Sequence, residues 1–411
     1  MKVTLAGPGV NRGNSSAWFI SQSLSRAQRY FRTGEGYFTP GGGGGEIFSA
    51  VPDLGHSLTH TALSYRFKHG VAGVDATNDT GVLGMTNGGP PNDMIPREGL
   101  SLPGGELLSE SFGRVSVARA ATFYGFGAHV LPAGGGAPLR KLFLRMIGGS
   151  SPAEVAREGQ IAPNLGGFER FSAFVGETQA ANGFLIHRAT LQPDPGLGVG
   201  SANNEGLWHQ TRGIVVRKGG EVVPGEAGVV FSRILGFWPC GPDRVLVHAV
   251  AKGPGIKASN DGGLWLWDYD GGAYTLQTLL REGDSLPHPD APRVGVIQRV
   301  DADAETGRYT VLVSLTGSAG ANQALLTGEA GAGNTGLLKA LRLPAPRLRK
   351  GTPMLGVLSG SARVTALSLA GSTDKTGAGG KGRAQVINAT GQIMTRVSFT
   401  SGAQAFLTGR P

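Results

Sequence analysis

The chain has 411 residues, a formal net charge of +9 at pH 7 and one cysteine, Cys240. A single cysteine excludes an internal disulfide framework, and no run of about 18 apolar residues that could span a membrane is present. Glycine supplies 70 residues, more than twice its average share of about 7%. There is no three-residue period of the collagen kind, and aromatic and β-branched residues are too frequent for a disordered chain. The composition therefore predicts an all-β protein with many tight turns.

The basic charge favours anionic partners such as an acidic glycan or a negatively charged cell envelope. The basic residues are scattered and no run of four or more Lys/Arg occurs, so we do not expect binding to nucleic acid. Residues 1–20 contain Gly-Pro-Gly, Asn and Arg where the apolar core of a leader would stand. We predict no signal peptide there.

The chain begins with a glycine-rich segment, residues 7–18, which resembles residues 253–265 further along. This similarity predicts that the chain starts inside a repeating unit. Residues 21–30 are the one stretch with enough amphipathic character for a helix. Residues 41–45 are five glycines without a following Lys-Ser/Thr, which predicts a flexible connection and not a phosphate-binding loop.

A short motif then recurs along the chain: Arg-Glu-Gly or a close variant, with a proline a few residues later. We refer to it as the mark. Its arginines are about 60–68 residues apart, at Arg32, Arg97, Arg157, Arg217, Arg281 and Arg349. The glycine permits a turn with positive φ, and the arginine can join neighbouring units by paired hydrogen bonds to a carboxylate or to carbonyls. We therefore predict a structural role for the mark, carried by Arg97, Gly99, Arg157, Gly159, Arg217, Gly219, Arg281 and Gly283.

Between marks, each unit has the same order of parts: an apolar run, an alternating strand, a turn with Asn and Gly, and two further strands. The alternating strand is clearest in residues 244–250, and the turn in residues 78–81 and 260–263. Four short strands in about 60 residues are typical of a β-propeller blade. We predict one β-propeller over residues 1–411 with seven four-stranded blades, six being the alternative. The approximate blades are 1–36 with 402–411, 37–97, 98–157, 158–217, 218–281, 282–349 and 350–401.

The two ends of the chain bear on how the propeller closes. The N-terminal unit lacks its first strand, and residues 403–407 form one spare strand after the last unit. We expect the N- and C-terminal segments to pair, because this would close the ring and remove two exposed sheet edges.

The marks resemble those of a bacterial family of secreted tandem-repeat proteins of the choice-of-anchor type, with the consensus Asn-x-x-Gly-x-x-Ala-Phe and a recurrent Arg-Glu-Gly-Asp-x-x-Pro-Gly. Residues 281–287 nearly match the second consensus, whereas residues 181–184 match the first only roughly. The resemblance is best over residues 32–353. It implies an extracellular or cell-surface β-propeller and implies no reaction. Family members carry a leader and a C-terminal anchor, and neither is recognisable here, so a cytoplasmic location stays open.

A few histidines and carboxylates are candidate metal ligands. His56 and His60 have an i, i+4 spacing that can place two imidazoles on one face, with Asp53 nearby, but the glutamate of the metalloprotease motif is missing. Asp301 and Asp303, with a third acid two residues on, put carboxylates on one face of an extended segment, which would suit a weak calcium site. Apart from calcium, we predict no cofactor.

Four further histidines, His69, His129, His187 and His248, lie near the end of the second strand of successive units. A ring of imidazoles could bind a metal, but we interpret each one as capping its own blade by a hydrogen bond to the backbone. Two tryptophans, Trp265 and Trp267, point the same way on a strand. They could stack on sugar rings if exposed, and packing in the core is the interpretation that we favour.

No local motif for Ser/His/Asp catalysis is present. We therefore predict a non-catalytic β-propeller, extracellular or at the cell surface, that serves as a binding or self-assembly module. Its expected partners are an anionic glycan, other copies of itself or an envelope assembly. The alternative is a carbohydrate-active enzyme, a glycoside hydrolase or lyase, with its site at the mouth of the propeller channel, where residues far apart in sequence converge.

Overall fold

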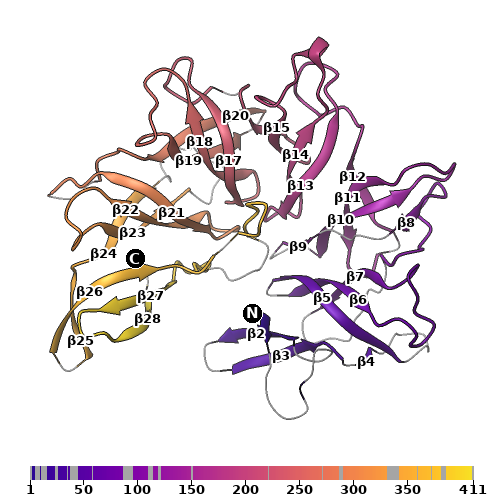
Figure 1. The fold of residues 1–411 in the computed structure, drawn as a ribbon, viewed down its shortest axis with the longest axis horizontal. Coiled ribbons are helices and arrows are strands. Elements are labelled where there is room, and N and C mark those ends of the chain that lie inside the picture. Colours follow the sequence, from indigo (N-terminus) through magenta and orange to yellow (C-terminus); the bar gives the residue numbers. More distant parts are fainter. Residues whose placement is uncertain are drawn as a thin grey trace. The chain divides into compact units, whose positions relative to one another are not determined.

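The computed structural model describes residues 2–4, 10, 16–23, 26–34, 36–37, 45–57, 59–86, 96–109, 114–118, 122–149, 151–220, 222–270, 272–286, 290–330, 342–358, 360–371, 373–380 and 386–409. Over these residues the chain forms antiparallel sheets, most of them with four strands in chain order. Sheets of this kind are typical of β-propeller blades (Figure 1), and the predicted all-β propeller class is confirmed, whereas the number of seven blades stays a prediction. No helix in the described part of the chain is long and apolar enough to cross a membrane.

The chain divides into two compact units, and the first comprises residues 1–160 with 381–383. It contains a three-stranded sheet, a four-stranded sheet in the order β4-β5-β6-β7, and a sheet in which both β8 and β9 pair with β10. The strands are β1 (Lys2–Thr4), β2 (Ser16–Ser23), β3 (Arg26–Arg32), β4 (Gly36–Tyr37), β5 (Glu46–His56), β6 (His60–Phe67), β7 (Thr80–Thr86), β8 (Leu107–Ser109), β9 (Val115–Val117), β10 (Phe123–Leu131), β11 (Leu139–Met146) and β12 (Ala153–Arg157).

The second unit comprises residues 161–380 with 384–411. Its described residues form four sheets, each with four strands in chain order. The elements are β13 (Phe171–Gln179), β14 (Leu185–Leu191), the 3₁₀ turn η1 (Pro195–Leu197), β15 (Glu205–His209), β16 (Gly213–Arg217), β17 (Val230–Pro239), β18 (Arg244–Lys252), β19 (Gly262–Asp270), β20 (Ala273–Arg281), β21 (Val294–Ala302), β22 (Arg308–Leu315), β23 (Gln323–Glu329), β24 (Arg342–Arg349), β25 (Pro353–Leu358), β26 (Gly360–Ser368), β27 (Ile393–Phe399) and β28 (Gln404–Gly409).

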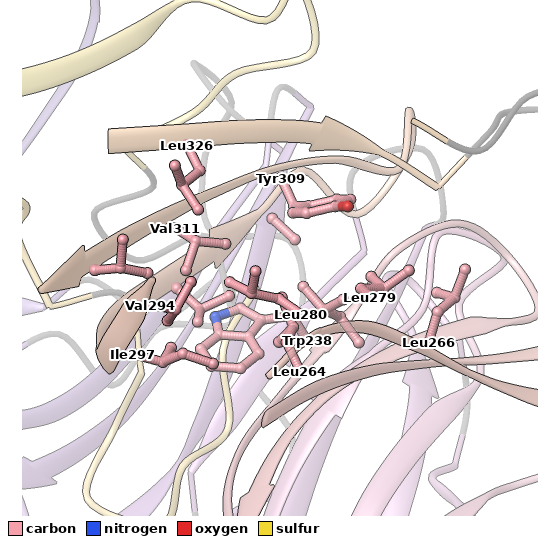
Figure 2. Close-up of a cluster of buried hydrophobic side chains, with 14 of the residues drawn as sticks. Trp238, Leu264, Leu266, Leu279, Leu280, Val294, Ile297, Tyr309, Val311 and Leu326 are labelled. Carbon is pink, nitrogen blue, oxygen red and sulfur yellow. The ribbon is translucent and has the colours of Figure 1, made fainter. Parts of the chain in front are cut away.

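The core of the second unit lies between successive sheets. Side chains alternate between the two faces of a strand, so one strand contributes to the packing on both sides of its sheet. On β18, Val245 and Val247 pack in the cluster that joins β13–β16 to β17–β20, and Leu246 packs in the cluster that joins β17–β20 to β21–β24. Figure 2 shows Trp238 in the middle of the cluster between β17–β20 and β21–β24, among leucines and valines of both sheets. Apolar residues on both faces thus hold neighbouring blades together.

Two predicted elements were wrong. Within residues 21–30, the one stretch with helical character in the sequence, residues 21–23 belong to strand β2 and residues 26–30 to strand β3, and these strands pair with each other. Residues 404–407 of the segment 403–407, predicted as a spare strand, lie in β28, and β28 pairs with β27 as the fourth strand of the last sheet. Pairing with β27 places β28 next to the strand that precedes it in the chain, which is the simplest antiparallel connection.

Candidate functional site

The arginine of the mark ties the end of its own sheet to the segment that begins that sheet. Arg97 donates from Nε to the carbonyl of Asn78 (2.6 Å) and from Nη1 to Oε1 of Glu46 (2.7 Å), the first residue of β5. Similar contacts join Arg217 to Asn203 and Glu169, Arg281 to Asn260 and Glu226, and Arg349 to Asp290. These contacts differ from the bridge between neighbouring units that the sequence suggested, because the acid precedes or begins the first long strand of the same sheet.

The glycine of the mark has a positive φ at each predicted position. The φ values are 82° at Gly99, 77° at Gly159, 68° at Gly219 and 90° at Gly283. A residue with a Cβ rarely adopts this conformation, and at Gly219 a Cβ would also lie 2.5 Å from the carbonyl oxygen of Ala202. The recurrence of glycine after the arginine thus has a backbone cause.

We expect Arg217→Met to lower the free energy of unfolding by about 2–3 kcal/mol, because it leaves the carboxylate of Glu169, 7% exposed, without its cation. Arg157→Met is the matched control, since this arginine of another mark has a side chain that is 53% exposed and should cost less than about 0.5 kcal/mol. Urea denaturation of both variants measures the difference. Equal losses of unfolding free energy in the two variants would contradict a stabilising role of the contact between Arg217 and Glu169.

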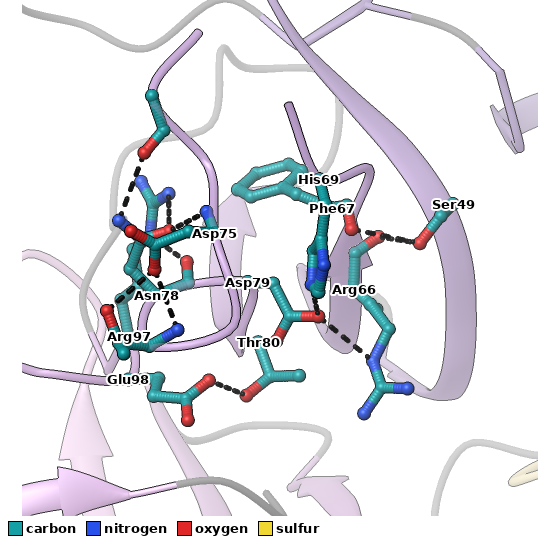
Figure 3. Close-up of polar contacts among 12 residues, drawn as sticks. Ser49, Arg66, Phe67, His69, Asp75, Asn78, Asp79, Thr80, Arg97 and Glu98 are labelled. Atoms are coloured by element: carbon teal, nitrogen blue, oxygen red, sulfur yellow. Dashed lines mark hydrogen bonds and ion pairs between the residues drawn. The ribbon is translucent and has the colours of Figure 1, made fainter. Parts of the chain in front are cut away.

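One mark adjoins a cluster of charged side chains in the first unit (Figure 3). Asp79 stands in the Asn-Asp-Thr-Gly turn before β7, and its Oδ2 is 2.7 Å from Nε2 of His69 and 3.5 Å from Nε of Arg66. Thr80 donates a hydrogen bond from Oγ1 to Oε2 of Glu98 (2.9 Å). The side chains of His69 and Arg66 are 54% and 56% exposed, so the cluster is open to solvent.

The two carboxyl groups of this cluster lie in different environments. Burial raises the pKa of Glu98 above its usual value of 4.5, and the neighbouring charge of Asp79 raises it further, whereas the hydrogen bond from Thr80 opposes the shift. Asp79 has two cationic or ionisable partners, His69 and Arg66. Paired titratable groups with opposed environments are a common sign of an acid–base site.

A similar pair of carboxyl groups in another sheet lacks the histidine and the arginine of this cluster. In the sheet β17–β20, Asp261 lies near Glu282, and burial and the charge of Asp261 raise the pKa of Glu282. Phe67 N donates to Asp79 O and Ala251 N donates to Asp261 O, so Phe67 corresponds to Ala251. By this correspondence Gly253 takes the position of His69, and Val250 takes the position of Arg66. Glu282 also accepts from the backbone of Gly262 and Ile297, which ties two sheets together.

The arrangement around Asp79 can perform three chemical tasks. The imidazole of His69, held by a carboxylate, can accept a proton. The carboxyl of Glu98 can donate one. The guanidinium of Arg66 can bind an anionic group. In the sequence His69, the Asn-Asp turn and the mark stand as separate features, and the signal that joins them is their occurrence within one repeating unit.

The predicted metal ligands are not brought together. Among the described residues, no group of three or more His, Cys, Asp or Glu side chains is placed to hold a metal. His56 ends β5 and His60 begins β6, so their spacing spans a hairpin turn and not one face of a strand. Burial lowers the pKa of His56 to about 4, and its Nδ1 is 2.7 Å from Oγ1 of Thr61.

The predicted calcium ligands have other partners. Asp301 accepts hydrogen bonds from the backbone N–H groups of Val386 (2.6 Å) and Ile387 (3.4 Å). Asp303 accepts from the backbone of Glu305 and Thr306 and so caps a turn. Backbone N–H groups thus occupy Oδ2 of Asp301 and Oδ1 of Asp303, oxygen atoms that a calcium ion would need. Burial raises the pKa of Asp301 to about 7.

The tryptophans considered for sugar stacking are inaccessible. Trp265 and Trp267 are both 0% exposed. Trp265 packs edge-on against Phe231, and Trp267 stacks on His209. The strand β19 that carries them lies inside its sheet, between β18 and β20, so both indoles contribute to the core and cannot stack on a sugar from solvent.

The histidine series does not share one role. His69 binds a side chain, Asp79, and not the backbone. His187 is 3% exposed, and neither ring nitrogen has a hydrogen-bond partner. Burial lowers the pKa of His248 to about 4, and the charge of Arg233 lowers it further. Backbone capping, the interpretation made from the sequence, is wrong for His69 and His187.

The edge of β17 that is not paired with β18 is covered by the protein's own backbone. Phe237 N donates to Gly377 O and Gly379 N donates to Phe237 O, each at 2.9 Å. Thr178 of β13 donates from Oγ1 to the carbonyl of Gly379 (2.6 Å). Residues 373–380 therefore lie beside the first strands of two sheets of the second unit.

Solved structures similar to this chain include the α-L-arabinofuranosidase of Fusarium graminearum in complex with arabinobiose, at 10% identity and a TM-score of 0.30, covering 87% of this chain and 90% of that one. The α-L-arabinanase of Penicillium chrysogenum matches at 10% identity and a TM-score of 0.30, over 76% and 88%. A Hadza microbial sialidase matches at 12% identity and a TM-score of 0.30, over 67% and 55%. At these values the likeness concerns the fold and not individual residues.

The leading prediction of a non-catalytic binding or self-assembly module is corrected, because the structures named above are glycoside hydrolase propellers, and it is not retained. No curated protein compared with the chain matches it. A family model described as a family of unknown function, DUF7453, matches residues 60–407, and the chain therefore belongs to this family.

Proposed function

We propose that this chain is a carbohydrate-active enzyme, a glycoside hydrolase or lyase, with His69, Asp79 and Glu98 as its acid–base residues. The observation that carries the proposal is the solvent-open cluster in which Asp79 holds His69 at 2.7 Å while Glu98 lies next to it with a raised pKa. Cleavage of a glycosidic bond needs one group that protonates the leaving oxygen and a second that accepts a proton or stabilises positive charge.

Each residue has a defined task in this proposal. Glu98 donates its proton to the leaving oxygen as the bond to the sugar carbon breaks. In a hydrolase His69 accepts a proton from water as the water oxygen bonds to the sugar carbon that loses the leaving group. In a lyase it accepts the proton of the neighbouring sugar carbon as a carbon–carbon double bond forms. Asp79 keeps the imidazole oriented. Arg66 faces the same carboxylate and can bind an acidic group of the substrate.

The test is turnover of a panel of polysaccharides that includes arabinan, sialylated glycans and uronate-rich polymers. New reducing ends measure cleavage, and the absorbance of an unsaturated product separates a lyase from a hydrolase. We expect Glu98→Gln to lower turnover by about 100-fold or more. Glu282→Gln, the same change in the copy without histidine or arginine, should leave turnover within about twofold. Equal activity of the two variants would contradict the assignment of Glu98 as the acid.

The pH profile provides an independent reading of Glu98. Since Glu98 must be protonated to act as the acid, and its pKa lies above the usual value, the wild-type rate should fall as pH rises through that pKa. In Glu98→Gln the residual rate should lose this alkaline limb. A limb that is unchanged in the variant would assign the proton to another group.

A further inference from the structure

In four sheets, one residue on each of the first three strands lies directly opposite its neighbour on the next strand, and we call these three residues the central row of the sheet. The first residue of each row lies three positions before the residue whose backbone N–H closes the turn between the first two strands. One of the four rows differs from the other three. Three of the rows are entirely apolar and buried: Leu54–Leu63–Leu83, Phe237–Val247–Trp265 and Val300–Val311–Leu326.

The fourth row, on β13–β15, is Glu177–His187–Trp208. These side chains are 0%, 3% and 0% exposed. A carboxylate and an imidazole thus occupy positions that hold phenylalanine, valine or leucine elsewhere. Polar residues that break a packing rule in this way are expected at functional sites.

The polar atoms of this row have no partners. Both oxygens of Glu177 and both ring nitrogens of His187 make no hydrogen bond. Gln179 stands two residues after Glu177, on the same face of the strand, and is 1% exposed. Its Nε2 donates to the carbonyl of Gly183 (2.7 Å), but its Oε1 has no partner.

The three side chains share one chemical property. A carboxylate and an amide oxygen are acceptors, and a neutral imidazole offers one acceptor nitrogen. A buried carboxylate and buried acceptor atoms that have no hydrogen-bond partner are costly unless a cation neutralises them.

We propose that Glu177, Gln179 and His187 bind a divalent transition-metal ion, of which zinc is the representative probe. Imidazole nitrogen and carboxylate oxygen are common zinc ligands, and the amide oxygen supplies a third donor. This site differs from the carboxylates of Asp301 and Asp303, whose oxygens accept hydrogen bonds from backbone N–H groups. It is also separate from the acid–base cluster of the first unit, so it does not depend on the proposed function.

The test is zinc binding by the full chain after treatment with a chelator, measured by calorimetry and by metal analysis of the dialysed protein. We expect about one zinc per chain and a higher unfolding temperature with zinc than without it. The double variant Glu177→Phe and His187→Val copies the row Phe237–Val247 of the next sheet, so it should fold. It should bind zinc at least about 100-fold more weakly and lose the thermal shift.

The control is His56→Ala with His60→Ala, which removes the two histidines that sequence spacing suggested as ligands. This variant should bind zinc as the wild type does. Absence of zinc binding by the wild type, or retention of full affinity by the double variant of the row, would overturn the proposal. Loss of zinc binding only in the variant of His56 and His60 would overturn the proposal and assign the zinc to the hairpin between β5 and β6.

Discussion

Asp301→Asn is expected to stabilise the protein by about 4 kcal/mol at pH 8 and by only about 1 kcal/mol at pH 4.5. The carboxyl group is 1% exposed, and its usual pKa of 3.8 is raised to about 7 by burial. Hydrogen bonds from Val386 and Ile387 and the backbone of Ala302 oppose this shift. Each pKa unit corresponds to about 1.4 kcal/mol, so a shift of about three units gives this magnitude.

The sign follows from proton binding in the two states. Below about pH 3 the carboxyl group is protonated whether the chain is folded or unfolded, and the stabilising contribution is complete. Between about pH 4 and 7 the unfolded chain ionises while the folded chain keeps its proton, so stability falls as pH rises. Asparagine cannot ionise, and its carbonyl oxygen can still accept from Val386 and Ile387.

Urea denaturation of both proteins at pH 4.5, 6 and 8 would measure this difference. Comparing the variant with the wild type is necessary because buried histidines act in the opposite direction. The pKa values of His187 and His248 are lowered to about 3 and about 4, so their contribution is lost as pH falls below 6.5. A difference between the two proteins that does not change with pH would show that Asp301 has an ordinary pKa.

Much of the fold could be predicted because the evidence for it is local and repeated. The mark recurs at nearly constant spacing, and its glycine is required by a positive φ that the sequence can reveal. Alternating runs such as residues 244–250 have the two-residue period of a strand. The errors came where the local signal is weak. Residues 21–30 have both helical and strand character, and only pairing between β2 and β3 decides between them.

The candidate sites could not be predicted in the same way. His69, Asp79 and Glu98 come from the end of one strand, a turn and a mark, and the antiparallel return of the chain brings them together. Glu177 and His187 face each other only because of the register between β13 and β14. A one-residue change of register would place them on opposite faces, and the sequence does not determine register to that accuracy.

Trp265→Ala should lower the free energy of unfolding by about 3–5 kcal/mol, because the indole is fully buried and its removal leaves a cavity. Its ring is 4.9 Å from that of Phe231, centroid to centroid, at an angle of 89°, and the guanidinium carbon of Arg281 lies 6.0 Å from the ring centroid. The change therefore removes contacts with two elements of the sheet as well as the apolar burial.

Trp265→Phe is the matched variant for this prediction. It keeps an aromatic ring in the cluster and removes an indole N–H that has no hydrogen-bond partner, so the cost should stay below about 2 kcal/mol. Thermal and urea unfolding measure both changes, and a glycan-binding assay under folding conditions measures the alternative role. Because Trp265 is 0% exposed, we expect Trp265→Ala to reduce stability and to leave any glycan binding by the folded fraction unchanged. Wild-type stability together with loss of glycan binding would contradict this prediction, because the indole would then have to leave the core to reach the sugar.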